Sequence, residues 1–241
     1  MAVKELSRRK FIGKAAAGMA GAAITFKTAQ SAVSYNRIIG ANDRMNIGFL
    51  GCGARSSGHQ SMVKMSEKDK NLAVVAACDI WKNNREKAAG NCKKLFGNDV
   101  KQFKYSEDFL ALPELDAVMI ATGDFQHARL LAEVVKAGKD CYCEKPLSTD
   151  VEDAKLARSS VLSSKQVVQM GSQWLSDPMQ IKVRDIVRSG KLGQITKIEQ
   201  VWNDNNHRWH DSDDPDVKAI HEEDTDWNRW LLGKPYCPFD P

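Results

Sequence analysis

A glycine-rich turn that follows a short apolar run constrains the fold of this chain more than any other feature. Residues 46–59 read Asn-Ile-Gly-Phe-Leu-Gly-Cys-Gly-Ala-Arg-Ser-Ser-Gly-His, the pattern of a buried strand that passes through a turn into a helix. Gly51 would make the tight turn, and Gly53 would let the backbone approach a phosphate near the free N–H groups of the helix. Ser56 stands where a third glycine is expected and Gly58 follows later, which indicates a slightly different approach of helix to strand. The turn predicts a site for a dinucleotide pyrophosphate.

A carboxylate at the end of the next apolar run supports this prediction. Residues 72–78 are apolar and are followed by Asp79. At the tip of a second strand, such a carboxylate accepts hydrogen bonds from ribose hydroxyls and repels a 2′-phosphate, which favours NAD and makes NADP the lesser expectation. Lys82 and Arg85 weaken that preference, because either could bind a phosphate. Alternatively, Asp79 simply ends a strand.

Strand-like and helix-like stretches alternate from Met45 onward. This alternation predicts an α/β fold, with a doubly wound parallel sheet whose ligand lies at the carboxyl ends of the strands. The expected strands are 47–50, 72–78, 117–121, 140–143 and 167–170, with 101–105 as a more polar edge strand, and the expected helices include 83–96, 127–137 and 151–163.

Composition excludes several other classes of protein. Lys and Arg exceed Asp and Glu by only 35 to 31, without a basic stripe, so no nucleic-acid partner is expected. Among the six cysteines, Cys78, Cys141 and Cys143 lie in or beside apolar strand runs and Cys52 lies inside the glycine turn, which indicates small core residues. No second Cys or His pair completes a zinc site, so no metal is expected.

The N-terminus has the features of an export signal. Arg8 and Arg9 precede a mildly apolar stretch, residues 15–26, that is too short and too weakly apolar to span a membrane. This pattern resembles a twin-arginine signal, and it predicts a signal peptide at 1–31, a linker at 32–44 and a periplasmic or otherwise exported product.

The order of motifs resembles one family of oxidoreductases. The glycine turn and the strand ending in Asp79 are followed by Ala-Thr-Gly-Asp-Phe-Gln-His at 121–127 and by Gly-Lys-Asp-Cys-Tyr-Cys-Glu-Lys-Pro-Leu at 138–147. Together they resemble the glucose-fructose oxidoreductase, inositol dehydrogenase and rhizopine-catabolism (Gfo/Idh/MocA) family. The resemblance implies an NAD(P)-binding domain at 45–172, followed by the start of an open-sheet α/β domain at 173–241.

The resemblance also implies roles for particular residues. In the family, the lysine of Glu-Lys-Pro lies beside the nicotinamide and the substrate carbinol, which makes Lys145 the expected catalytic residue. His127 is the second catalytic candidate, and packing at the start of a helix explains it equally well. The expected cofactor contacts are Gly51, Gly53, Ala54, Arg55, Asp79, Thr122, Asp124, Glu144, Lys145 and Pro146.

The second domain carries the expected substrate contacts. Gln173 and Trp174 precede an expected helix at 178–189, and a strand is expected at 195–202. His207 lies in a polar and aromatic cluster suited to sugar hydroxyls. The resemblance implies that the family's sheet domain continues beyond the part present here, so we expect a truncated product, with a homo-oligomer possible at full length.

Three functions remain open on the sequence. The first is an NAD-dependent oxidoreductase that moves hydride between a sugar or polyol carbinol and nicotinamide. The second is a glycosidase that keeps its NAD bound, and the third is a noncatalytic protein that binds the cofactor.

Overall fold

A six-stranded parallel sheet organises the chain. In the computed structural model, which describes residues 44–201 and 215–240, the strands lie in the order β3-β2-β1-β4-β5-β6. The strands are β1 Met45–Leu50, β2 Leu72–Cys78, β3 Lys101–Phe103, β4 Ala117–Ile120, β5 Asp140–Glu144 and β6 Val168–Gly171. This order is that of a doubly wound dinucleotide-binding sheet, which confirms the predicted fold class, and β3 is the predicted edge strand. The predicted signal peptide and His207 lie outside the described residues.

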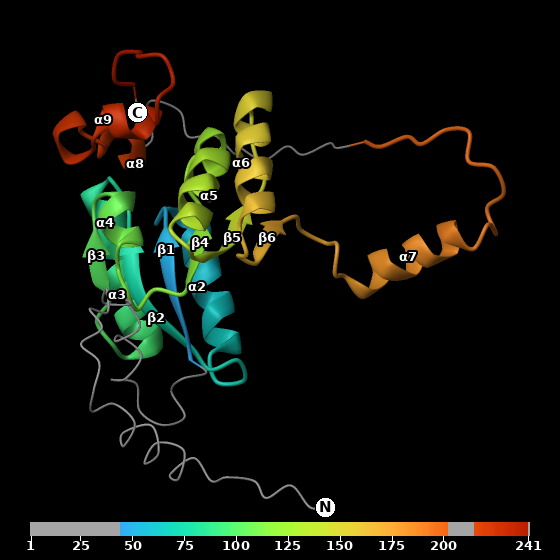
Figure 1. Cartoon of the computed structure of the whole chain (residues 1–241), viewed down its shortest axis with the longest axis horizontal. Coiled ribbons are helices and arrows are strands. Elements are labelled where there is room, and N and C mark those ends of the chain that lie inside the picture. Colours follow the sequence, from blue (N-terminus) through green and yellow to red (C-terminus); the bar gives the residue numbers. More distant parts are fainter. Residues whose placement is uncertain (1–43, 202–214, 241) are drawn as a thin grey trace, which may run out of the picture. The chain divides into compact units, whose positions relative to one another are not determined.

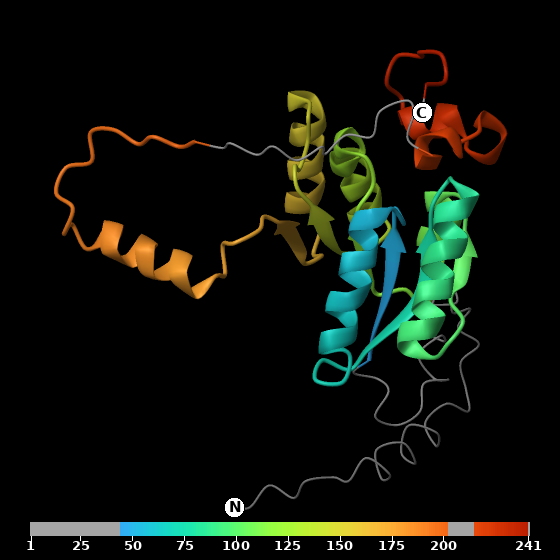
Figure 2. The ribbon, with the colours of Figure 1, turned by 180° about the vertical axis from the view of Figure 1, so that it is seen from behind.

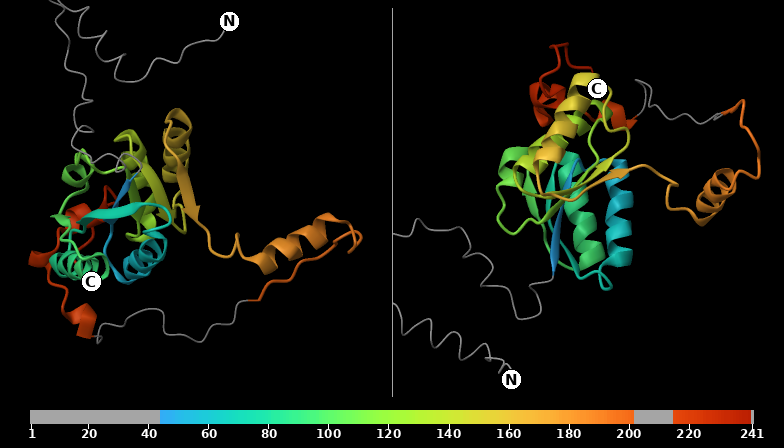
Figure 3. Two further views of the ribbon diagram at one scale, coloured as in Figure 1. Left: turned by 90° about the horizontal axis from the view of Figure 1, so that it is seen from below. Right: turned by 45° about the vertical axis from the view of Figure 1, so that its right-hand side comes forward.

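Helices cover both faces of the sheet. Figure 1 shows α5 and α6 in front of it, Figure 2 shows α2 and α3 from behind, and the left view of Figure 3 shows the sheet between the two layers. The helices are α2 Ala54–Ser66, α3 Lys82–Phe96, α4 Ser106–Leu110, α5 His127–Lys136, α6 Val151–Ser163, α7 Pro178–Arg188, α8 Pro215–Lys218 and α9 Trp227–Leu231, with 3₁₀ turns η2 Asp124–Gln126 and η3 Glu222–Asp224.

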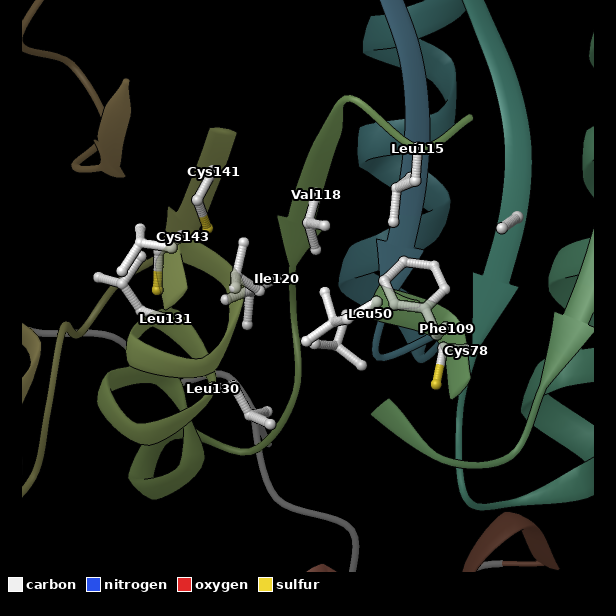
Figure 4. Close-up of a cluster of buried hydrophobic side chains, with 14 of the residues drawn as sticks. Leu50, Cys78, Phe109, Leu115, Val118, Ile120, Leu130, Leu131, Cys141 and Cys143 are labelled. Atoms are coloured by element: carbon white, nitrogen blue, oxygen red, sulfur yellow. The ribbon is translucent and has the colours of Figure 1, made fainter. Parts of the chain in front are cut away.

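Each face of the sheet has its own apolar core. On one face, Leu130 and Leu131 of α5 pack with Val118 and Ile120 of β4 and with the ring of Phe109 (Figure 4). On the other face, side chains of α2 and α3 pack against β1 and β2, among them Val63, Ala88, Cys92, Phe49 and Val74. Because alternate residues of a strand point to opposite faces, the central strands are apolar on both sides, as a covered parallel sheet requires.

The cysteines predicted to be core residues are buried. Cys52, Cys78, Cys141 and Cys143 are free thiols with at most 4% of their surface exposed. Burial raises the pKa of the Cys143 thiol to about 12, so this thiol stays protonated at physiological pH. Within the described ranges, no group of three or more His, Cys, Asp or Glu side chains could hold a metal ion, and no helix is long and apolar enough to cross a membrane.

The segment after the sheet differs from the prediction. The helix expected at 178–189 is present as α7, because Asp177 caps its first turn by accepting hydrogen bonds from the N–H groups of Met179 and Gln180. The strand expected at 195–202 was wrong for the described residues 195–201, which form no strand and are exposed. A strand needs a hydrogen-bonded neighbour, and none of the described residues pairs with this segment.

Candidate cofactor site

A cavity of about 470 Å³ lies at the carboxyl ends of the strands. Its lining includes Gly51 and Gly53 after β1, Asp79 after β2 and Thr122 after β4. Four of the predicted cofactor residues therefore meet at one place, where the chain leaves the neighbouring strands β1 and β4 toward helices on opposite faces of the sheet. The volume is within the range of small-molecule sites.

The glycine turn at this cavity has the geometry that the sequence predicted. Gly51 has φ of 86°, and its N–H donates to Cys78 O at 2.9 Å. A Cβ at this position would lie 2.6 Å from the backbone of Ala121, so the turn has no room for a side chain. At Gly53, the cap residue of α2, a Cβ would meet no atom closer than 3.9 Å, which leaves room for a phosphate above the helix N-terminus.

The approach of α2 to the sheet is set at Ser56. Its side chain is fully buried, so serine occupies the position where the third glycine of the motif would pack. Gly58, by contrast, is exposed, with no atom within 4 Å of an added Cβ. Gly58 therefore does not replace the missing glycine.

Asp79 is held so that it can bind a ribose. Its Oδ2 accepts from the N–H of Cys52 at 2.7 Å, and its Oδ1 accepts from the N–H of Trp81 at 2.8 Å. Burial raises the pKa of this carboxyl above its ordinary value. Each carboxylate oxygen keeps further acceptor capacity, so Asp79 suits the hydroxyls of an adenosine ribose and not a 2′-phosphate.

The two cations that weakened the preference for NAD are held elsewhere. The Nη1 of Arg85 donates to the backbone O of Asp79 at 2.6 Å. The Nζ of Lys82 lies 3.9 Å from Glu86 Oε1 on the exposed face of α3. Neither Lys82 nor Arg85 lines the cavity, which supports NAD over NADP.

Glu144, buried at the end of β5, is the centre of a polar network. Its Oε1 accepts from Arg55 Nε at 2.6 Å and lies 2.9 Å from His59 Nε2, while its Oε2 accepts from the N–H of Lys145 at 3.0 Å. Burial would raise the pKa of Glu144, but the hydrogen bonds from His59, Arg55 and the Lys145 N–H lower it overall. The network joins the start of α2 to the Glu-Lys-Pro segment.

His59 is a member of this network that the sequence analysis missed. The residue is fully buried, with its ring edge-on to Tyr142 at 5.2 Å between centroids. Burial lowers the pKa of His59, so the ring is neutral near pH 7, and its Nε2 must carry the proton that it donates to the Glu144 carboxylate. His59 follows Arg55 by four residues, about one helical turn. This spacing alone predicts that the two side chains lie on one face of the helix, although it does not indicate their shared partner.

His127 is buried between two backbone carbonyls. Its Nδ1 lies 2.7 Å from Pro146 O and its Nε2 lies 3.2 Å from Thr122 O, and only 1% of the residue is exposed. Both contacts are to carbonyl oxygens, which can only accept, so a protonated ring nitrogen donates to one of these backbone groups. This geometry supports the packing interpretation of His127: the ring ties the turn after β4 to the Glu-Lys-Pro segment and does not face the cavity.

The remaining predicted residues lie outside the cavity lining. Lys145 is exposed directly after β5, and the peptide bond to Pro146 is cis. The exposed Gln173 and Trp174 precede α7. The exposed residues Ala54 and Asp124 stand at the starts of α2 and η2.

Replacing Glu144 by glutamine is expected to lower the free energy of unfolding near neutral pH by about 1–3 kcal/mol. A carboxamide has one acceptor oxygen and one NH₂ donor, so its NH₂ must face either the Arg55 and His59 donors or the Lys145 N–H. Because the folded-state pKa of Glu144 is lowered, its contribution is present above the ordinary value of 4.5 and is lost as pH falls through the folded-state pKa. The difference between the two proteins should therefore narrow in acid.

Urea denaturation near neutral pH and at about pH 4 measures this difference. The matched control is Glu152→Gln on α6, which removes an exposed ion pair with Lys155 and is expected to change stability by less than about 0.5 kcal/mol. Equal losses in the two variants would contradict the role of Glu144.

Comparison with known proteins places the chain in a family. Residues 45–172 match the Gfo/Idh/MocA model, described as an oxidoreductase family with an NAD-binding Rossmann fold. Inositol 2-dehydrogenase 2 of Saccharopolyspora erythraea is 28% identical over 193 residues, which cover 79% of this chain and 54% of that protein. Inositol 2-dehydrogenase of Gluconacetobacter diazotrophicus is 26% identical over 201 residues, covering 80% and 56%. The chain spans about half the length of these curated relatives.

A solved structure shares the fold. Scyllo-inositol dehydrogenase of Lactobacillus casei, with NAD(H) and scyllo-inositol bound, superposes with a TM-score of 0.56 at 23% identity, over 64% of this chain and 43% of that one. The family match covers more than half of the chain and coincides with the sheet that carries the glycine turn and Asp79. The chain belongs to the Gfo/Idh/MocA oxidoreductase family, with an NAD-binding Rossmann fold.

Proposed function

We propose that this protein is an NAD-dependent dehydrogenase that oxidises a secondary carbinol of a polyol or sugar. The observation that carries the proposal is the cavity at the strand ends, lined by a glycine turn and by a carboxylate placed for a ribose. The inositol dehydrogenases among the relatives support a polyol as the substrate class.

Some residues of the site would bind the cofactor or the substrate, and others would position the residues that bind. Asp79 would hold the adenosine ribose, and the N–H groups at the start of α2 would bind the pyrophosphate above Gly53. When bound, NAD supplies the hydride acceptor. The Nζ of Lys145 would donate a hydrogen bond to the carbinol oxygen and stabilise the negative charge that develops there as the hydroxyl proton passes to water. Glu144, held by Arg55 and His59, fixes the backbone N–H of Lys145.

The test is a screen of polyols and sugars with NAD, followed by the absorbance of NADH. We expect NADH to accumulate with at least one polyol such as an inositol. Two other functions are compatible with the sequence: a glycosidase that retains its NAD and a noncatalytic protein that binds the cofactor. Glycoside cleavage without net NADH would favour the first alternative, and NADH binding without turnover of any substrate would favour the second.

We also propose that the protein is exported by the twin-arginine route. The pair Arg8-Arg9 before the apolar residues 15–26 supports this proposal. Replacing both arginines by lysine preserves the charge, and we expect it to leave the protein in the cytoplasmic fraction, whereas wild type reaches the periplasm. An unchanged distribution between the two fractions would contradict export by this route.

A further inference from the structure

The cavity has a second wall that the sequence motifs did not indicate. Besides the glycine turn and the ends of β2 and β4, its lining includes Trp227, Arg229, Trp230, Leu232 and Phe239. All five belong to residues 226–239, here called the strap. In Figures 1 and 2 this segment lies at the carboxyl ends of the strands, although it follows β6 by more than fifty residues of sequence.

Hydrogen bonds to the nucleotide-binding sheet domain fix the strap along its length. Near β3, Tyr105 Oη donates to Asp226 Oδ2 at 3.1 Å. After β4, Gln126 Nε2 donates to Trp230 O at 2.5 Å, and along α5, Arg129 Nη1 donates to Leu232 O at 2.9 Å. The strap therefore runs across the carboxyl ends of the strands, from the residues after β3 to helix α5.

An ion pair with α6 ends this row of contacts. Lys234 Nζ lies 2.9 Å from Asp153 Oδ2, and Asp153 also accepts from Arg129 Nε at 2.8 Å. Burial would raise the pKa of Asp153, but Lys234 and Arg129 lower it overall. Leu231, only 6% exposed, adds an apolar anchor. The strap is thus held by buried and half-buried partners.

The strap presents aromatic rings to the cavity. Trp227 and Trp230 stack at 4.8 Å between centroids with 7° between their planes. Phe125 packs edge-on against Trp230, and Phe239 packs edge-on against Trp227. Arg229 lies over the Tyr105 ring at 5.0 Å and pairs with Glu107. Flat aromatic faces beside a cation are suited to stacking on a nucleobase.

The position of the strap points to the adenosine end of the site. Tyr105, its first contact, follows β3, which is the neighbour of β2 in the sheet, and Asp79 stands at the end of β2. The indole Nε1 of Trp81, which also lines the cavity, is buried with no hydrogen-bond partner among the described residues. Asp79 and the aromatic side chains of the strap therefore line the same cavity.

We propose that the strap is the second wall of the dinucleotide site, and that its paired tryptophans, Trp227 and Trp230, contact the adenosine half of the bound cofactor. The inference rests on the proposed function for the presence of a dinucleotide. It adds a binding element that lies outside residues 45–172, the part that matches the family's NAD-binding domain.

Calorimetric titration of leucine variants tests this proposal. Trp227→Leu and Trp230→Leu keep an apolar side chain but remove the flat ring, so we expect the Kd for NADH and for ADP-ribose to rise roughly tenfold. The affinity for nicotinamide mononucleotide, which lacks the adenosine, should not change. Trp230→Phe keeps an aromatic face and should retain most of the affinity.

The matched control is Tyr236→Leu, which removes an aromatic ring from the same strap at a position that is 70% exposed and does not line the cavity. Melting temperatures check that each variant is folded. If Trp227→Leu does not fold, the proposal is tested by comparing the affinities of Trp230→Phe and Trp230→Leu. Unchanged or tighter binding of ADP-ribose by the tryptophan variants would overturn the proposal. Failure of wild type to bind any dinucleotide would instead overturn the proposed function.

Discussion

Lys145→Ala is expected to lower kcat for polyol oxidation by roughly 10²–10³-fold, the loss typical of removing one donor to a developing oxyanion. Lys145 is exposed directly after β5, and its backbone N–H is fixed by Glu144 Oε2 at 3.0 Å. Its side chain would act on the substrate oxygen and not on the adenosine half of the cofactor. The affinity for NADH should therefore stay close to that of wild type, which calorimetry measures alongside the steady-state kinetics.

Two further variants sharpen this experiment. Lys155→Ala removes an exposed lysine that pairs with Glu152 on its own helix, and it should leave both kcat and NADH affinity unchanged. Lys145→Arg keeps the charge but changes the shape of the donor, so we expect partial activity. Full activity in Lys145→Ala, in a preparation whose wild type oxidises the polyol, would remove Lys145 from the mechanism.

Gly51→Ala is expected to weaken NADH binding by roughly 10–100-fold and to lower the free energy of unfolding by about 2–4 kcal/mol. The new Cβ would lie 2.6 Å from the backbone of Ala121, and the φ of 86° disfavours any L side chain. Ala121 is tied to β1 by its N–H, which donates to Leu50 O at 2.8 Å, so it cannot move away without breaking the strand pairing. The turn must move instead, and the pyrophosphate site moves with it.

The same substitution at Gly58 is the matched control. Gly58 lies within α2, with no atom within 4 Å of an added Cβ. Alanine there should stabilise the helix by about 0.5–1 kcal/mol and leave NADH binding unchanged. Thermal melts and calorimetric titration of the two variants provide the comparison. Equal NADH affinity in Gly51→Ala and Gly58→Ala would show that the turn does not bind the cofactor.

The sheet was predictable because its determinants are local. Each apolar run is short and ends at a turn residue or a carboxylate, so the strand positions, the edge strand β3 and the ligand-binding side of the sheet followed from periodicity and from the glycine turn. Gly51, Gly53, Asp79 and Thr122 were predicted to share one site and do share one cavity.

The remainder depended on contacts between distant parts of the chain. Nothing in the local sequence around His59 indicates that it meets Glu144, 85 residues later. Likewise, Trp230 belongs to a segment that resembled part of a second domain, yet its backbone is bound by Gln126, 104 residues earlier. The strand expected at 195–202 was wrong because a local apolar pattern is not sufficient for a strand. Among the described residues, no strand pairs with this segment.

The most direct test of the central claim is calorimetric titration of the purified protein with NADH and, separately, with NADPH. The glycine turn and Asp79 predict one NADH bound per chain, with NADPH at least roughly tenfold weaker because Asp79 repels a 2′-phosphate. Absence of binding of either dinucleotide to the folded protein, or tighter binding of NADPH than of NADH, would contradict this account of the site.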